Sequence, residues 1–188
     1  RLPGARGHGR RKDMRLRRDI ALSAAPARGF VAVGLCWGTF AGLTPEIKAR
    51  LGAGDGAFGT AMFVAALGAL AAMWLAPRTA AALGRNAMRA AALAMALAVL
   101  MPGLVTSLPV FAAAMLVLAG ASGTLDVLMN AQLSGVEARS GRTLMNLNHA
   151  VFSFAYAGAA LFTGLGRELG LPPAAILAGP ALCILVLL

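Results

Sequence analysis

One acidic residue lies inside a long apolar stretch, where its type and its neighbours suggest chemistry. Asp126 is the only ionisable residue between Leu108 and Val136. Asn130 follows it by four residues and Ser122 precedes it by four, so a helix would place the three side chains on one face. An acidic group near the middle of a membrane is costly unless it is paired, protonated or hydrated. The trio indicates either proton exchange and solute binding or a structural hydrogen-bond network between helices.

The next apolar stretch carries a second group of polar residues. Asn146, His149 and Ser153 are separated by three and four positions, and Tyr156 follows about one turn later. Residues at these spacings are neighbours on a helix surface. A histidine within the membrane is a functional candidate by default, with a packing role as the alternative. We expect His149 to hydrogen-bond Asp126 if the two helices adjoin. We expect no metal or other cofactor, because no second histidine lies beyond the N-terminal tail.

A short match to a hydrolase motif suggests a different chemistry. Residues 120–123, Gly-Ala-Ser-Gly, resemble the G-x-S-G sequence around the nucleophile of rhomboid intramembrane proteases. Ser122 would then be the nucleophile and His149 its base. The histidine follows after only 27 residues, whereas the rhomboid family places it two helices further on. An intramembrane serine protease is therefore kept as an alternative, and our preferred interpretation is a protein that is not an enzyme.

The composition is that of a membrane protein. Hydrophobic residues make up 59% of the 188 residues and charged residues 13%, whereas soluble domains have about 45–50% and about 25%. The mean hydropathy is +0.76. A soluble domain of this size could not bury so much apolar surface. The net charge of +10 does not indicate a nucleic-acid partner, because nine of the 17 basic residues lie in residues 1–28 and the rest of the chain is apolar.

Six segments have the length and composition of membrane-spanning helices, which need about 20 mostly apolar residues. We expect them at residues 28–44, 56–76, 86–107, 108–135, 144–165 and 172–188. Pro45 and Pro77 should end the first two, whereas Pro102 and Pro180 lie inside the third and the sixth. The predicted fold class is all-α, a polytopic membrane protein built as a six-helix bundle with a truncated last helix. Residues 1–27 are predicted to form a basic cytoplasmic tail, and part of it is not native if translation starts at Met14.

The basic residues also predict an orientation. With the N-terminus inside, fourteen lysines and arginines fall in the tail and the inner loops, and three fall in the outer loops. The positive-inside rule then places the N-terminus in the cytoplasm and the chain in the inner (plasma) membrane. Within the first span, Gly34, Gly38 and Gly42 recur every four residues, which favours close helix packing over a substrate contact. Trp37 lies among them and either lines a cavity or faces lipid.

Several stretches resemble the major facilitator superfamily of transporters. WLAPRTAAALGR (residues 74–85) is similar to the signature of its loop between helices two and three, which Gly84 and Arg85 match, although the signature's aspartate is absent. The stretches GLCWGTF, LDVLMNAQLSGVE and LMNLNHAVFSFAYAGA resemble the sugar-permease branch that includes the fucose permease. In that branch helix four carries an acidic residue with an asparagine four positions later, the spacing of Asp126 and Asn130. His149 falls at a polar position of the family's helix five.

The resemblance implies a fold of two six-helix bundles with the substrate between them, of which this chain is the N-terminal one. We therefore expect a proton-coupled symporter that carries a small polar solute, with sugars among the candidates. It would need a C-terminal six-helix bundle as its partner in the lipid bilayer. Asp126 would exchange the proton, and Asn130, Asn146, His149 and Trp37 would orient it or bind the solute. A non-catalytic membrane scaffold or half-transporter is the remaining alternative.

Overall fold

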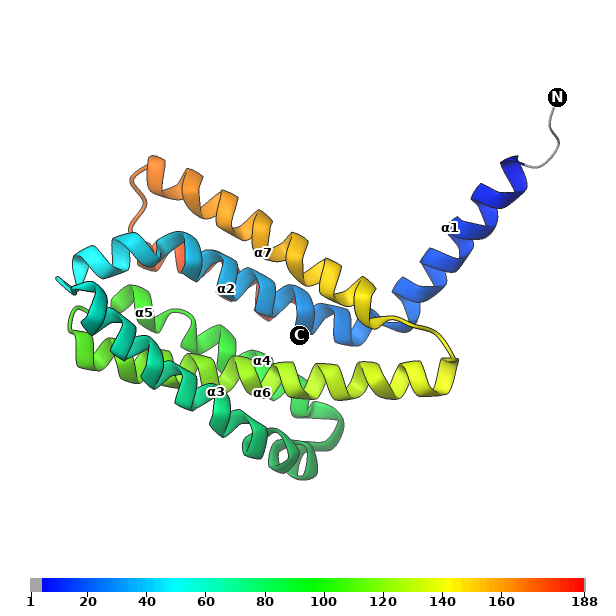
Figure 1. Ribbon diagram of the computed structural model, residues 1–188, viewed down its shortest axis with the longest axis horizontal. Coiled ribbons are helices and arrows are strands. Elements are labelled where there is room, and N and C mark those ends of the chain that lie inside the picture. The colour runs from blue at the N-terminus through cyan, green and yellow to red at the C-terminus, as the bar shows by residue number, and fades with distance from the viewer. Residues whose placement is uncertain (1–4, 188) are drawn as a thin grey trace.

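The chain folds entirely into helices over the described residues, which confirms the all-α prediction. The computed structural model describes the backbone of residues 5–187 and the side chains of residues 14–187 (Figure 1). Its elements are α1 (Ala5–Leu22), α2 (Ala24–Arg50), α3 (Asp55–Leu83), the 3₁₀ turn η1 (Gly84–Asn86), α4 (Ala87–Ala98), α5 (Met101–Leu104), α6 (Leu108–Ser140), α7 (Met145–Glu168) and α8 (Pro173–Leu187).

The predicted segments fall on these helices with two corrections. Pro45 and Pro77 do not end their helices but lie inside α2 and α3. Arginine side chains donate to carbonyls three residues before each proline: Arg167 Nη1 to that of Gly42 at 3.1 Å and Arg78 Nη1 to that of Trp74 at 2.9 Å. In the third segment the helix breaks between α4 and α5, and Pro102 occupies the first turn of α5.

Four stretches of the described chain are long and apolar enough to cross a membrane, with mean hydropathies between 1.2 and 1.9. They are Ala24–Arg50, Asp55–Leu104, Leu108–Ser140 and Met145–Glu168. The second contains α3, α4 and α5, and Figure 1 shows that the chain reverses at η1, so this stretch makes two passes rather than one. The last helix, α8, is apolar but has only 15 residues.

Glycines bring two pairs of helices into close contact. α2 packs along α7, and α3 packs along α6. A Cβ atom added at Gly34 would lie 2.6 Å from the Phe152 carbonyl oxygen, and one at Gly42 would lie 2.7 Å from Thr163 Cγ2. At Gly38 and at Gly68 the added atom would collide with the backbone of the facing helix. The predicted packing role of the α2 glycines is therefore confirmed.

The core lies inside a ring of four helices. α2 and α4 each contact both α6 and α8, so the four helices enclose a common interior. Phe30, Met95, Leu118, Leu125 and Ile184 fill it and are at most 1% exposed. Large apolar side chains also cover the outside, and Phe154, Phe162 and Leu161 on α7 are 73–80% exposed. Such an apolar exterior fits a lipid environment.

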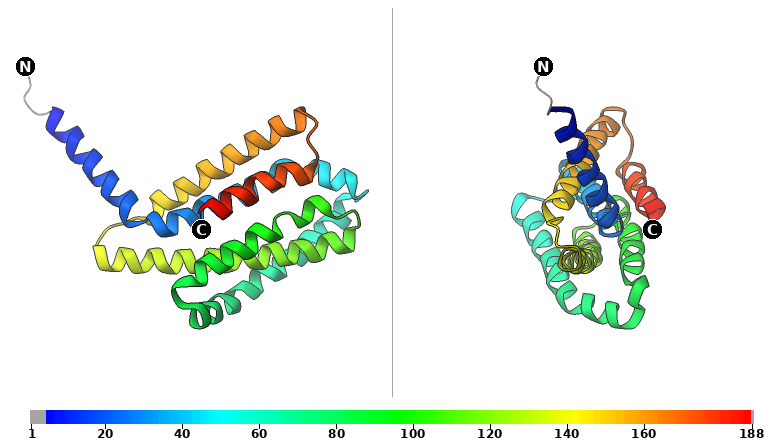
Figure 2. Two further views of the ribbon diagram at one scale, coloured as in Figure 1. Left: turned by 180° about the vertical axis from the view of Figure 1, so that it is seen from behind. Right: turned by 90° about the vertical axis from the view of Figure 1, so that its right-hand side faces the viewer.

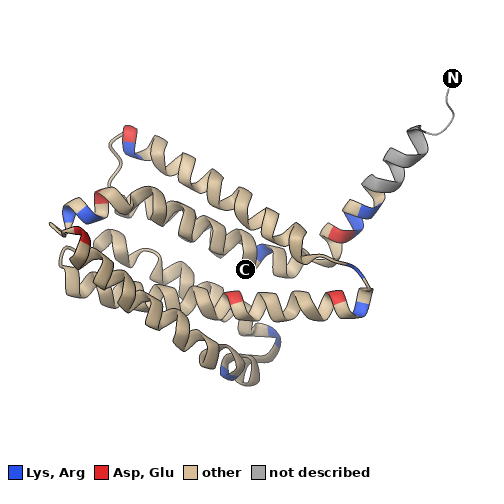
Figure 3. Ribbon diagram, in the orientation of Figure 1, with Lys and Arg blue, Asp and Glu red and all other residues tan. Residues whose placement is uncertain are grey.

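Charged residues gather near the helix ends (Figure 3). α1 projects from one end of the bundle (Figure 2), and Asp19 near its C-terminal end pairs with Arg142 in the loop between α6 and α7. The buried side chains of the described residues are thus apolar or uncharged, and Asp126 lies partway along α6 with an exposed side chain.

Candidate functional site

Asp126 and its predicted partner lie together on α6. Asn130 Nδ2 donates to Asp126 Oδ1 at 3.2 Å and to the Asp126 carbonyl at 2.9 Å. Asp126 is exposed and Asn130 is half-buried, so the carboxyl group is not enclosed by the bundle. Ser122, one turn earlier, is only 4% exposed. Ser122, Asp126 and Asn130 thus form a row along α6, in which the hydroxyl group is buried and the carboxyl group is accessible.

Trp37 connects α2 to this row. Its indole Nε1 donates to Ser122 Oγ at 3.2 Å, and its ring packs edge-on against Phe40 at a centroid distance of 5.7 Å. The indole is half-buried. The sequence left open whether this residue lines a cavity or faces lipid, and the structure turns it toward α6. A tryptophan with an apolar ring and a satisfied N–H fits such a half-buried position.

The polar residues of α7 form a second row. Asn146, His149 and Ser153 are all exposed, and Ser153 Oγ donates to the His149 carbonyl at 2.9 Å. The imidazole packs edge-on against Phe30 of α2, with 5.1 Å between ring centroids and 72° between the planes. Tyr156 continues the row and is half-buried.

Both rows flank one face of α2. Phe30 and Trp37 are seven residues apart and therefore share a helix face. Phe30 contacts His149 of α7, while Trp37 contacts Ser122 of α6. We call the surface formed by these aromatic residues and the two rows the polar face; its members are Phe30, Trp37, Ser122, Asp126, Asn130, Asn146, His149, Ser153 and Tyr156.

The expected hydrogen bond between His149 and Asp126 is wrong. The prediction assumed that α6 and α7 adjoin, but α7 packs mainly on α2, and α6 packs mainly on α3. The Asp126 carboxylate accepts its hydrogen bond from Asn130, and the His149 ring rests on Phe30.

The same geometry argues against a serine protease. A serine nucleophile needs a base within hydrogen-bond reach. Ser122 instead accepts a hydrogen bond from Trp37, and His149 is held by Phe30. The flanking glycines have a packing role, because a Cβ atom at Gly123 would lie 2.9 Å from Ala72 Cβ on α3. The short motif is thus explained by helix packing.

Polar groups at the helix ends serve the fold. Glu137 caps α7, since one of its carboxylate oxygens accepts hydrogen bonds from the backbone N–H groups of Leu144 and Met145. On the same side of the bundle, the hydrogen bond from Arg142 to Asp19 raises the pKa of the Arg142 guanidinium.

At the opposite end, the hydrogen bond from Lys48 and the charge of that residue lower the pKa of the exposed Asp55. Arg50 donates to the carbonyls of Gly103 and Val105 at 2.8 Å each, which ties the end of α2 to the end of α5. These contacts use basic residues that the sequence placed in outer loops.

Sequence reasoning missed a basic cavity at one end of the four-helix ring. A cavity of about 190 Å³ is lined by Arg28 of α2, Arg85 of η1, Arg89 of α4 and Gln132 of α6. In the sequence, Arg28 and Arg89 were used only to predict the orientation, and Arg85 was used also for the resemblance to the loop signature. Arg85 and Arg89 are neighbours in the chain, but no local pattern reveals that Arg28 of α2 and Gln132 of α6 meet them.

Comparisons with known proteins find two similar proteins whose names describe them as transporters. The chain is 35% identical over 174 residues to an uncharacterized MFS-type transporter of Yersinia pestis, an alignment that covers 90% of this chain and 44% of the relative. It is 29% identical over 139 residues to the uncharacterized transporter y4wD of Sinorhizobium fredii, covering 73% of this chain and 37% of the relative. The chain thus spans less than half the length of these relatives. No family model matches, and no solved structure matches.

Proposed function

We propose that this chain forms one bundle of a secondary transporter of the major facilitator type, which moves a small polar solute together with protons. The observation that carries the proposal is the placement of an accessible carboxyl group, Asp126, on the polar face of an otherwise apolar bundle. The names of the two relatives support the transporter class. We further propose an inner-membrane location with a cytoplasmic N-terminus.

In this proposal the Asp126 carboxyl group binds and releases the transported proton. In its charged form the carboxylate accepts the Asn130 amide hydrogen at 3.2 Å, which stabilises the negative charge. When the solute side of the site closes and water leaves, the charged form becomes costly and a proton binds. The protonated carboxyl group can then donate a hydrogen bond to a solute oxygen, so proton binding and solute binding are coupled at one side chain.

The remaining members of the polar face are assigned to the solute. His149 and Asn146 on α7 offer donors and acceptors opposite Asp126, and they are exposed and so free to bind a ligand. The ring of Trp37 is half-buried beside the α6 row, which suits contact with the apolar face of a ring-shaped polar solute such as a sugar, while the buried Phe30 supports the His149 ring from below. A solute with several hydroxyl groups would satisfy both rows at once.

Transport also requires a second bundle. Substrate sites in carriers built from repeats lie at the interface of the repeats near the middle of the membrane, and one repeat rocks against the other. We assign the polar face of this chain to that interface. The second bundle would come from the further length that the two relatives possess, and a second copy of the chain is the alternative source.

Solute uptake by the full-length protein in proteoliposomes tests the proton assignment. Asp126→Asn should abolish uptake driven by a pH gradient, while exchange of solute across the membrane without a gradient persists, because the amide binds solute but cannot release a proton. Asp55→Asn is the matched control, since this carboxylate is exposed at the start of α3 and pairs with Lys48. Gradient-driven uptake by the Asp126→Asn variant at the wild-type rate would refute the assignment.

A further inference from the structure

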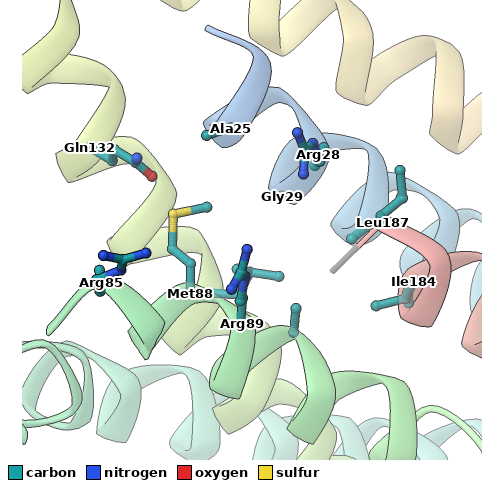
Figure 4. A pocket seen from close by; sticks show the side chains of 12 residues that line it. Ala25, Arg28, Gly29, Arg85, Met88, Arg89, Gln132, Ile184 and Leu187 are labelled. Atoms are coloured by element: carbon teal, nitrogen blue, oxygen red, sulfur yellow. The ribbon is translucent and has the colours of Figure 1, made fainter. Parts of the chain in front are cut away.

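The basic cavity at the end of the four-helix ring has an unusual lining. Figure 4 shows Arg28 entering from α2, Arg85 and Arg89 from the facing side, and Gln132 from α6. The lining holds these three arginines and no acidic residue. The ion pairs formed by side chains of residues 14–187 use other partners, namely Lys48 with Asp55, Arg142 with Asp19, and Arg167 with Glu46. All three arginines are exposed, so water screens their mutual repulsion, and an anion bound among them would reduce that repulsion further.

Arginine at this density selects a particular type of anion. The guanidinium group offers donors in a planar fork that matches two oxygens of a phosphate or a carboxylate. Three such forks from different directions suit a tetrahedral phosphate better than a flat carboxylate. The amide of Gln132 can donate a further hydrogen bond to a phosphate oxygen or to a neighbouring hydroxyl group. The lining therefore favours a phosphate group.

The other side of the cavity is apolar. Met88, Leu125, Ile184 and Leu187 line it together with small residues. The neighbouring outer surfaces of α4 and α8 are apolar too, with Leu93 44%, Leu182 63% and Val186 87% exposed. A water molecule takes about 30 Å³, so a cavity of about 190 Å³ holds a headgroup but not acyl chains. The exposed side chains of α8 give those chains a surface along which to lie.

We propose that this cavity binds the phosphate headgroup of an anionic phospholipid, with the acyl chains running along α4 and α8. The site lies where α2 and α4 begin, at the level of their N-termini. Headgroups occupy that level of a bilayer. The bound lipid would join α2, α4 and α6 through one anion. The site lies on the ring interior and does not use Asp126 or the polar face, so it is independent of the proposed transport site.

Lipid binding to the purified protein tests the proposal. Native mass spectrometry from mixed micelles measures the apparent dissociation constant of phosphatidylglycerol, with phosphatidylcholine as the zwitterionic comparison. The wild type should prefer phosphatidylglycerol. The double variant Arg85→Gln/Arg89→Gln should bind it roughly thirty-fold more weakly, at about five-fold for each arginine lost near a membrane surface.

Arg78→Gln is the matched control, because this arginine lies near the same turn but its guanidinium donates to the Trp74 carbonyl outside the cavity. It should leave the dissociation constant unchanged. Should the double variant fail to fold, Arg89→Gln alone is measured, with an expected weakening of about five-fold. An unchanged preference in the Arg85/Arg89 variants, or an equal loss in Arg78→Gln, overturns the proposal. Displacement of the lipid by millimolar inorganic phosphate overturns the lipid assignment in favour of a soluble anion.

Discussion

Replacing Gly38 by alanine should separate α2 from α7. An added Cβ atom would collide with the carbonyl oxygen, carbonyl carbon and Cα of Tyr156, all of which belong to the backbone of α7. No rotamer change relieves such a contact, so the helices must move apart. Overpacking of a tight interface costs about 1–3 kcal/mol, and this site belongs at the upper end. Alanine is favoured over glycine in a helix by about 1 kcal/mol. The net loss of unfolding free energy should be about 2 kcal/mol.

Two further glycines calibrate that estimate. At Gly42 the obstacles are two atoms of the Thr163 side chain, Cγ2 at 2.7 Å and Cβ at 2.9 Å, whereas the facing carbonyl oxygen of Ala160 is 3.4 Å away. The cost there should be about 1 kcal/mol, and the helix preference should offset it. At Gly158 on α7 the added atom would meet nothing within 4 Å. Gly158→Ala should therefore stabilise the protein by up to about 1 kcal/mol.

Reversible unfolding in mixed detergent micelles measures all three variants against the wild type. The expected order of stability is Gly158→Ala, then Gly42→Ala, then Gly38→Ala. Equal stability of Gly38→Ala and Gly158→Ala would falsify the close contact between α2 and α7, because helix preference would then be the only effect at both sites.

Two smaller predictions follow from the polar contacts. Trp37→Phe removes the hydrogen bond to Ser122 and should lower the unfolding free energy by about 1 kcal/mol. A double-mutant cycle with Ser122→Ala should show that the two losses are coupled. Losses that simply add would contradict a hydrogen bond between the two side chains. Lys48 lowers the pKa of Asp55, so the pair stabilises the fold above the unfolded pKa of about 4 and loses this effect as pH falls through the lower folded pKa. In Asp55→Asn the unfolding free energy should fall less steeply as the pH is lowered below about 4. An unchanged pH dependence in this range would contradict a stabilising pair of Lys48 and Asp55.

Local pattern was enough to predict the apolar helices, but not α1 or the break between α4 and α5. Runs of apolar residues predict helices long enough to span a bilayer, and the short polar connections between them locate the turns. The spacing of Asp126 and Asn130 placed both side chains on one helix face, and their hydrogen bond confirms this. The glycine spacing on α2 correctly predicted a packing surface. All of these features depend only on residues within a few turns of one another.

Features that depend on neighbouring helices were not predictable in the same way. Pro45 was expected to end its helix, yet α2 continues to Arg50, and its end is held by contacts to other helices, such as that of Arg167 of α7 with the Gly42 carbonyl. His149 was assigned to Asp126, yet it packs on Phe30 because α2 lies between the two polar rows. In each case a residue from another helix determined the outcome.

The difference between the features that the sequence predicts and those that depend on neighbouring helices has a physical basis. A helix satisfies its own backbone hydrogen bonds, so an apolar sequence of sufficient length forms one in a membrane wherever it later packs. The sequence by itself therefore determined the all-α class, the helical segments and the face that carries Asp126. The pairing of helices depends on close contacts between distant small residues, such as Gly38 against Tyr156, and many pairings share the same apolar pattern. Only the tertiary structure could thus set Trp37 against Ser122 and bring Arg28, Arg85 and Arg89 around one cavity.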